Sequence, residues 1–339
     1  MHAAPLSRIT GVYPLWAVEG GSVTISGDGF QVDPDLPEVK FGGVPARVSS
    51  ASQQSLTATV PAGLDGGKTA VRVSTAPGET AYVEIGSPLA TGLHQVDSPA
   101  FDREGNLYVT FSGSRGQQTP VSIYVVRPDG AREPFVSGIP NPTSMTFDRD
   151  GHLLVSSRFD GCVYRVTPGG TVKAFASELG VACGLAVGPD GALYVGDRSG
   201  SVLRVEDERA TQFAEIPSSV AAFHLAFGPD GWLYVTAPTL ATRDVVYRVS
   251  PSGTVETFCE GFGRPQGLAF DEEGVLFVVD AIAGDACVYR LLPDRPGEKE
   301  RVLTAGSLVG LAFDPRGGLA LASNETVYRL QASLRPFFG

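Results

Sequence analysis

The segment Gly184-Leu-Ala-Val-Gly-Pro-Asp-Gly-Ala-Leu-Tyr-Val195 decides the fold of this chain, because its pattern occurs five more times. The other copies begin at Ser98, Ser144, His224, Gly267 and Gly310. In each copy a short apolar strand runs into a turn closed by a glycine, which tolerates positive φ, and a second strand follows. The turn glycines recur at intervals of 40 to 46 residues. This period predicts a repeat architecture.

Two further strands follow each copy. The third carries a Val-Tyr-Arg pattern, as at 163–166 and 246–249, and the fourth lies beyond the next turn, as at 172–176. Four antiparallel strands in about 40 residues make one propeller blade, so we predict a six-bladed β-propeller over residues 87–335. The sixth repeat ends at its third strand. The segment 88–93 is similar to the fourth strand at 134–139, and we expect it to complete the last blade and close the ring.

Residues 8–86 lack this repeat. They contain short strands of alternating polarity between Gly and Pro turns, which predicts an immunoglobulin-like β-sandwich. The predicted fold class is therefore all-β, a sandwich followed by a propeller. The segment resembles an IPT/TIG domain, and that resemblance implies an extension or interaction module. We favour a structural spacer over a ligand-binding role.

The charge of the chain limits its partners. Lys and Arg number 26 and Asp and Glu number 37, so the net charge is −11. An acidic protein without a basic run is expected to bind neither nucleic acid nor an anionic membrane. The N-terminus does not have the pattern of a secretory signal, which predicts a cytoplasmic protein. The four cysteines, Cys162, Cys183, Cys259 and Cys287, lack zinc-site spacing, so free thiols are expected.

The repeat resembles the propellers of the NHL-repeat family and of the gluconolactonase/regucalcin-like (senescence marker protein) family. The resemblance implies a ligand site at one mouth of the central channel. In the gluconolactonase-like enzymes, Glu, Asn and Asp side chains there hold a divalent cation, which polarises the lactone carbonyl and helps to activate water.

The position that would supply such ligands lies directly before the first strand of each repeat. It holds Asp97, Thr143, Cys183, Phe223, Gln266 and Val309. Calcium prefers several oxygen ligands, and only one of these residues is a carboxylate, so metal-dependent lactonase activity is not favoured. If a divalent cation such as calcium binds, its ligands would be Asp97, Gln266, Asp197 and Asp280. For the last two we favour turn and inter-blade hydrogen bonds.

Other side chains of the same loops suggest anion binding or nucleophilic chemistry. Arg158 and Arg198 hold equivalent positions in neighbouring repeats, and together with Arg264 they could bind a carboxylate in bidentate fashion. The alternative is solvated arginines, or pairs with nearby aspartates. Cys183 with His224 has the residue types of a nucleophile and its base, although a packed thiol is favoured.

We therefore predict a binding or scaffold propeller that holds a small polar ligand or a protein segment at the channel mouth. The alternative is a gluconolactonase-like lactone hydrolase with an altered site, and whether the protein is an enzyme stays open. The predicted ligand-binding residues are Asp97, Thr143, Arg158, Cys183, Arg198, Phe223, His224, Arg264 and Gln266.

Overall fold

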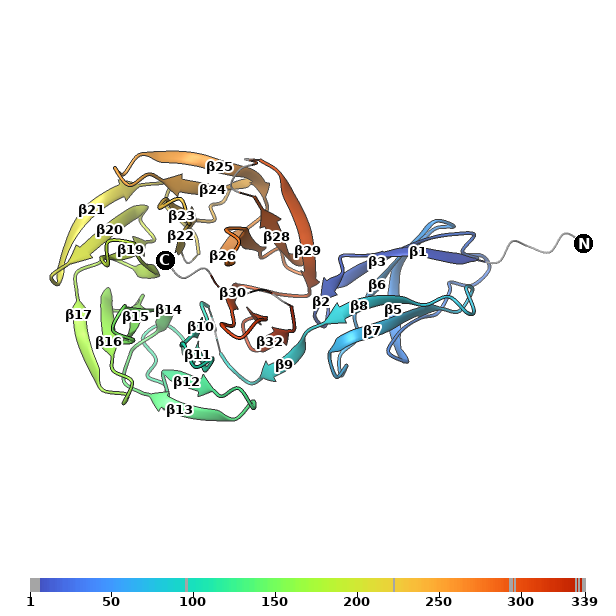
Figure 1. The fold of residues 1–339 in the computed structure, drawn as a ribbon, viewed down its shortest axis with the longest axis horizontal. Helices are drawn as coiled ribbons and strands as arrows, with labels where there is room; N and C mark the ends of the chain where they lie inside the picture. The colour runs from blue at the N-terminus through green and yellow to red at the C-terminus, as the bar shows by residue number, and fades with distance from the viewer. Residues whose placement is uncertain are drawn as a thin grey trace, which may run out of the picture.

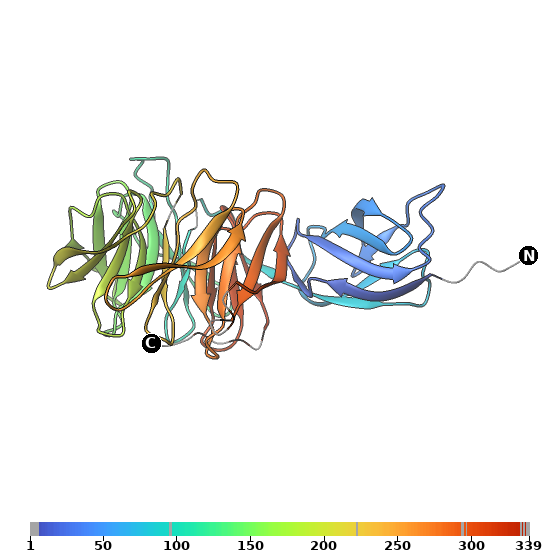
Figure 2. The same cartoon turned by 90° about the horizontal axis from the view of Figure 1, so that it is seen from above.

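The chain forms a small β-sandwich joined edge to edge to a ring of β-sheets (Figure 1). The computed structural model describes residues 7–94, 97–221, 223–292, 295, 297–332, 334 and 336. All regular elements in this part of the chain are strands. The ring is a disc with the sandwich beside its rim (Figure 2). Among the described residues no helix is long and apolar enough to span a membrane.

The sandwich uses the alternation expected from its sequence. One sheet pairs β1 (Arg8–Tyr13), β3 (Ser22–Asp28), β6 (Ser55–Thr59) and β5 (Val44–Ala51). The other pairs β4 (Val39–Phe41), β7 (Gly67–Val73), β8 (Ala81–Ile85) and β2 (Trp16–Ala17). Strand β5 belongs to both, because its first half pairs with β4 and its second half with β6. Alternate residues such as Val23 and Ile25 fill the core between the sheets.

The ring contains five separate four-stranded antiparallel sheets. The first two are β10 (Ala100–Phe101), β11 (Leu107–Thr110), β12 (Ile123–Val126), β13 (Arg132–Val136), and β14 (Pro142–Phe147), β15 (Leu153–Ser157), β16 (Cys162–Val166), β17 (Val172–Ala176). The next two are β18 (Ala182–Val187), β19 (Leu193–Asp197), β20 (Ser201–Glu206), β21 (Arg209–Glu215), and β22 (His224–Phe227), β23 (Leu233–Thr236), β24 (Asp244–Val249), β25 (Val255–Phe262). The fifth combines β30 (Gly310–Phe313), β31 (Leu319–Ala322), β32 (Val327–Leu330) and β9 (Ser87–Ala90).

The remaining sequence repeat is not a separate sheet, so five independent blades stand where six were predicted. Its strands β26 (Pro265–Phe270), β27 (Leu276–Asp280), β28 (Ala286–Leu291) and β29 (Lys299–Ala305) are antiparallel to one another. They belong to a 12-stranded sheet, because β2 of the sandwich lies parallel to both β29 and β8. The backbone pairs Trp16↔Leu303 and Ala17↔Thr304 make this junction.

Strand β9 overlaps the first three residues of the segment 88–93 that was expected to supply a fourth strand. It pairs antiparallel with β32, with Ala90 opposite Val327 and Pro88 opposite Tyr328. The outermost strand of that sheet therefore comes from the start of the propeller and its three inner strands from the end.

The repeated Tyr and Phe of the sequence pack neighbouring sheets together. The ring of Tyr108 lies edge-on to Phe147 at 5.3 Å, and Tyr234 lies edge-on to Phe270 at 4.9 Å. Tyr194–Phe227 and Phe277–Phe313 repeat the arrangement at 5.0 and 5.2 Å. Each pair joins the second strand of one repeat to the first strand of the next, in the edge-to-face geometry that aromatic rings prefer. The repeat motif thus encodes blade-to-blade packing.

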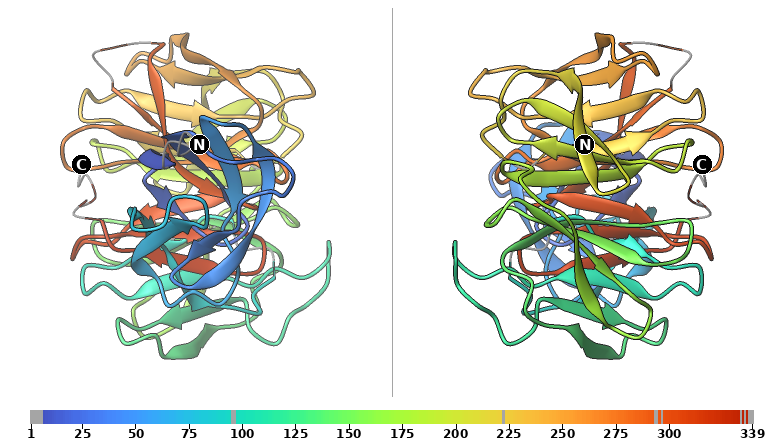
Figure 3. Two further views of the ribbon diagram at one scale, coloured as in Figure 1. Left: turned by 90° about the vertical axis from the view of Figure 1, so that its right-hand side faces the viewer. Right: turned by 90° about the vertical axis from the view of Figure 1, so that its left-hand side faces the viewer.

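The two faces of the ring are built from different connections. The face that we call the turn face carries the hairpin turns between first and second strands and between third and fourth strands. The loop face carries the connections from second to third strands and from each sheet to the next. The long connection between β11 and β12 projects from the disc on the side opposite the C-terminus (Figure 3).

The Asp and Arg of the repeat stabilise the turn face. Arg204 lies 2.9 Å from Asp190, and the Tyr194 hydroxyl donates to the same carboxylate at 3.3 Å. Arg329 lies 2.8 Å from Asp314, which is fully buried. The Tyr-Arg pattern of the third strands is therefore structural.

The sandwich shares core with the ring. Val18 is fully buried among side chains of β27–β32 and donates its backbone N–H to the Thr304 carbonyl at 3.0 Å. The Tyr328 hydroxyl donates to Glu19 Oε1 at 3.1 Å. Gly21 lies so close to this edge that a Cβ would be 2.6 Å from the Thr304 carbonyl oxygen. The sandwich is thus part of the ring's support as well as an extension.

Candidate functional site

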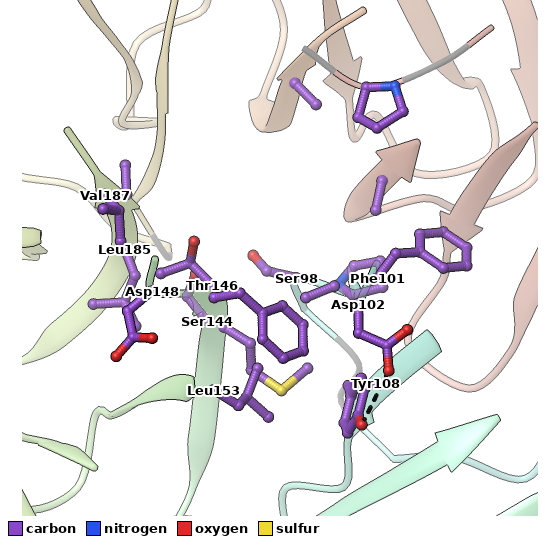
Figure 4. A pocket seen from close by; sticks show the side chains of 18 of the residues that line it. Ser98, Phe101, Asp102, Tyr108, Ser144, Thr146, Asp148, Leu153, Leu185 and Val187 are labelled. Atoms are coloured by element: carbon purple, nitrogen blue, oxygen red, sulfur yellow. Dashed lines mark hydrogen bonds between the residues drawn. The ribbon is translucent and has the colours of Figure 1, made fainter. Parts of the chain in front are cut away.

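A hollow of about 680 Å³ occupies the centre of the ring and reaches the turn face. The first strands of the repeats form its walls. Its lining includes the hydroxyl groups of Ser98, Ser144 and Thr146 and the aliphatic side chains of Leu185 and Val187 (Figure 4). A cavity of this size, with apolar walls and a few polar groups, has the character of a small-molecule site.

A serine, a histidine and an aspartate meet at the loop-face end of this hollow. Ser98 Oγ lies 3.1 Å from His224 Nδ1, and His224 Nε2 lies 3.3 Å from Asp97 Oδ1. Strands β10 and β22 face each other across the centre of the ring (Figure 1), so the contact crosses the channel. We call these three side chains the neck.

One nitrogen of the neck, His224 Nε2, has no well-aligned hydrogen-bond partner. His224 is 4% exposed, and its Nε2 makes no hydrogen bond with any described residue, because the Asp97 carboxylate is poorly aligned with it. A buried polar nitrogen without a partner is costly, and a ligand or water that bonded to it would remove that cost.

The ring of positions predicted to face the mouth is mostly buried between blades. Phe223 is fully buried and packs against Gly196, where a Cβ would lie 2.8 Å from its side chain. Thr143 is buried and donates its hydroxyl to the Asn141 carbonyl at 3.2 Å. Gln266 is 7% exposed. Of the nine predicted ligand-binding residues, His224 lines the hollow.

Cys183 is a packed thiol. Burial, and secondarily the negative charge of Asp97, raises its pKa to about 12, so the reactive thiolate is scarce at neutral pH. His224 bonds to Ser98 instead. All four cysteines are free thiols.

The predicted arginines all belong to the loop face. The positive charges of Arg158 and Arg198 both act on the Cys183 thiol and oppose the rise of its pKa. Arg198 Nη2 donates to the Val220 carbonyl at 3.0 Å. Arg264 is exposed.

The proposed cation ligands do not form a metal site. Asp197 Oδ1 accepts a hydrogen bond from the Val181 amide at 2.7 Å. Asp280 accepts from the amides of Arg264 at 2.6 Å and Gly263 at 3.0 Å. Both carboxylates thus bond to backbone amides of their own blade and not between blades, and turning them inward would leave those amides unpaired. The residues present do not fit the hard-cation site of gluconolactonase-like enzymes.

A second group of acidic residues, on the turn face, does not form a metal site either. Asp148, Asp150 and His152 bring ligand atoms within 4.8 Å of one another. However, the Arg165 guanidinium lies 2.6 Å from Asp148 and neutralises it.

Sequence reasoning missed Ser98, Ser144 and Thr146. A signal was available, because the first residue of the repeat is glycine in three copies and Ser98, Ser144 and His224 in the others. Those three departures are the polar residues at equivalent positions in the lining of the hollow.

Residues 7–86 match the IPT/TIG domain family. A search of curated protein sequences found no match. Among solved structures, a provisionally named gluconolactonase is 21% identical with a TM-score of 0.61, covering 75% of this chain and 94% of that one. An auxiliary nutrient binding protein from Bacteroides thetaiotaomicron is 15% identical with a TM-score of 0.58, covering 96% and 97%.

A catalytically inactive variant of virginiamycin B lyase from Staphylococcus aureus, solved with quinupristin, is 14% identical with a TM-score of 0.53, covering 98% of this chain and 97% of that one. At these identities the likeness concerns the fold alone. The comparisons therefore assign residues 7–86 to the IPT/TIG domain family and give the rest of the chain the fold of a β-propeller.

Proposed function

We propose that this protein is a binding propeller that holds a small polar ligand in the central hollow, against Ser98 and His224. The observation that carries the proposal is the buried imidazole of His224, which lies between Ser98 Oγ and the Asp97 carboxylate beside a hollow of about 680 Å³. The binding role of the similar nutrient binding protein supports the same function.

The lining favours an uncharged ligand that bears several hydroxyl groups. Ser98, Ser144, Thr146 and His224 offer neutral donors and acceptors, and aliphatic walls suit the C–H faces of such a molecule. Two carboxylates near the turn-face opening are already engaged: Asp148 lies 2.6 Å from Arg165, and Asp102 accepts hydrogen bonds from Asn106 at 2.7 and 2.8 Å. A cationic ligand would compete with these bonds.

The test is calorimetric titration with a panel of neutral monosaccharides and polyols. We expect at least one to bind, and His224→Ala and Ser98→Ala to weaken that binding about tenfold each, the typical effect of losing one buried hydrogen bond. His152→Ala is the matched control, because His152 lies outside the lining. Equal affinity in all variants would refute the site.

We further infer that β26–β29 act as a sixth blade and that the β9–β32 pairing closes the ring. The antiparallel pairing of β26 to β29, and their place between β25 and β30 in Figure 1, support this count. The sandwich, in this view, braces that blade through β2.

A hydrolase is the second candidate. Hydroxyl, imidazole and carboxylate lie in the order that activates a serine nucleophile: Ser98 Oγ would lose its proton to His224, and Asp97 would stabilise the imidazolium. Binding is preferred because the Asp97 carboxylate is poorly aligned with His224 Nε2, so the imidazole lacks the well-oriented partner that a catalytic base needs. Hydrolysis of gluconolactone or para-nitrophenyl acetate that Ser98→Ala abolishes, without any added metal, would reverse this preference.

A further inference from the structure

We propose that a short segment after β32 is a strap across the turn-face opening of the hollow and controls how fast small molecules enter it. The strap is defined by its described residues, Ala332, Leu334 and Pro336. The inference rests on the proposed function, because it concerns entry to the same hollow. Access to the hollow can nevertheless be measured without any ligand, so the two proposals can fail separately.

The loop-face end of the hollow is narrow, because neighbouring first strands approach each other there at the repeated glycine. A Cβ on Gly310 would lie 1.9 Å from the Asp97 carbonyl oxygen, and one on Gly267 would lie 2.6 Å from the Gly310 Cα. Contacts this short leave no room for a side chain at either glycine. The hydrogen bond of 3.1 Å between Ser98 and His224 crosses the channel at the same level. We therefore expect molecules to enter the hollow from the turn face.

The strap lies at the turn-face opening. Pro336 belongs to the lining of the hollow, together with Pro315 of the turn between β30 and β31. It also forms an antiparallel bridge with Asp271, which directly follows β26. Pro336 is therefore at the turn-face end of a strand that forms part of the wall of the hollow.

A second set of contacts holds the strap on the sheet of β30–β32. The Leu334 carbonyl accepts a hydrogen bond of 3.0 Å from the Gly318 amide, in the turn between β30 and β31. The side chains of Ala332 and Leu334 pack against the apolar core of β27–β32. The strap thus connects the turn between β30 and β31 with the end of β26, and it contributes to the lining between them.

The strap is held more weakly than the strands are. Leu334 and Pro336 carry apolar side chains, and Pro336 has no backbone N–H to donate. The Asp271 side chain is engaged elsewhere, since its Oδ1 accepts from the amides of Val275 at 2.9 Å and Glu273 at 3.1 Å. Release of the strap therefore leaves the turn after β26 intact. A segment held by so few contacts opens locally at a low free energy.

The closed and open positions of the strap differ in access to the hollow. When the strap is closed, Pro336 completes the lining at the opening. When it opens, the blades that form the rest of the wall keep their contacts. The strap should therefore change the rates of entry and release more than the shape of the site, as segments that cover binding sites commonly do.

The experiment measures how fast iodoacetamide labels a cysteine placed inside the hollow. Thr146→Cys supplies this cysteine, because Thr146 is part of the lining. Its labelling at neutral pH is compared in the full chain and in the same chain without residues 333–339. Mass spectrometry of the labelled peptides separates the new cysteine from the four native thiols. We expect removal of the strap to accelerate labelling about tenfold.

A milder variant retains the length of the chain. Leu334→Ala/Pro336→Ala shortens two side chains of the strap and should accelerate labelling of Thr146→Cys about threefold. This variant carries the test if the shortened chain does not fold, which circular dichroism detects. The matched control is Thr211→Cys, at an exposed threonine of β21 outside the lining, where labelling should not depend on the strap.

Equal labelling of Thr146→Cys with and without the strap would overturn the proposal. So would an equal acceleration of Thr211→Cys, because it would indicate a general loosening of the protein. Calorimetric titration of the same proteins with sugars and polyols separates this proposal from the proposed function. Unchanged labelling with retained sugar binding contradicts the strap alone, whereas faster labelling without any sugar binding supports the strap and contradicts the ligand.

Discussion

The two faces of the ring use the same residue types for different purposes. On the turn face, arginine pairs with aspartate within the protein, as in Arg204–Asp190 and Arg329–Asp314. On the loop face, the aspartates bind backbone amides, as Asp197 and Asp280 do, while Arg115 and Arg264 point outward as exposed residues. The repeat motif therefore accounts for the turn face, and the departures from it distinguish the loop face.

This difference shows where an interaction surface can evolve in a repeat protein. Turn-face residues recur in most repeats because every blade needs the same hairpin and the same contact with its neighbour. Loop-face connections differ in length and sequence because packing constrains them less. The neck lies between the two faces. Three repeats have glycine at their first position, whereas two others have Ser98 and His224, whose side chains enter the channel.

The largest expected effect comes from opening the ring on which both faces depend. Deleting residues 1–86 removes Val18 from the core and exposes the edge of β29, so we expect a folded but less stable propeller, by several kcal/mol. Deleting residues 1–95 also removes β9 and should abolish cooperative folding. Circular dichroism during heating measures both, and equal melting temperatures would contradict ring closure by β9.

The next largest effect on stability is expected from a matched pair of substitutions, one on each face. Asp314→Ala removes a buried carboxylate that binds Arg316 and Arg329, and it should lower the free energy of unfolding by about 3 kcal/mol. Arg243→Ala on the loop face should change it by less than about 0.5 kcal/mol. Urea unfolding followed by fluorescence gives both values. Similar losses would mean that loop-face arginines are structural too.

A smaller effect concerns the thiol that lies near the neck. The pKa of Cys183 is raised to about 12 in the folded protein from an ordinary 9.0. The folded state therefore holds this proton more tightly, so its contribution to stability is complete below pH 9.0 and is lost as the pH rises toward about 12.

At neutral pH, iodoacetamide should accordingly modify half-buried Cys162 before Cys183 in the native protein. Mass spectrometry of the labelled peptides distinguishes the two sites, with denatured protein as the control. Faster labelling of Cys183 would show that the loop-face mouth is open to reagents.

The smallest expected effect is that of divalent cations. Because Asp197 and Asp280 are engaged by amides, calcium and zinc should not bind in the micromolar range, and gluconolactone hydrolysis should not depend on either metal. Calorimetry followed by a lactonase assay checks this. Tight binding that Asp97→Ala removes would restore a metal-dependent hydrolase.

Most residues of the candidate site could not be predicted from local sequence patterns. The positions expected at the mouth are mostly buried, as Thr143, Cys183, Phe223 and Gln266 are, and local sequence does not show which side chains the neighbouring sheets will cover. Ser98 and His224 are 126 residues apart in the chain, and their contact depends on two strands facing each other across the ring.

Periodic side chains and turn glycines were enough to predict the β-strand repeat and the sandwich before it. The sequence also marked the Tyr-Arg pattern as structural. The folded structure was needed to show that β2 joins the sandwich to β26–β29, that Asp197 and Asp280 bind backbone amides, and that Ser98, His224 and Asp97 meet. Each of these depends on contacts between segments far apart in sequence, which no local periodicity encodes.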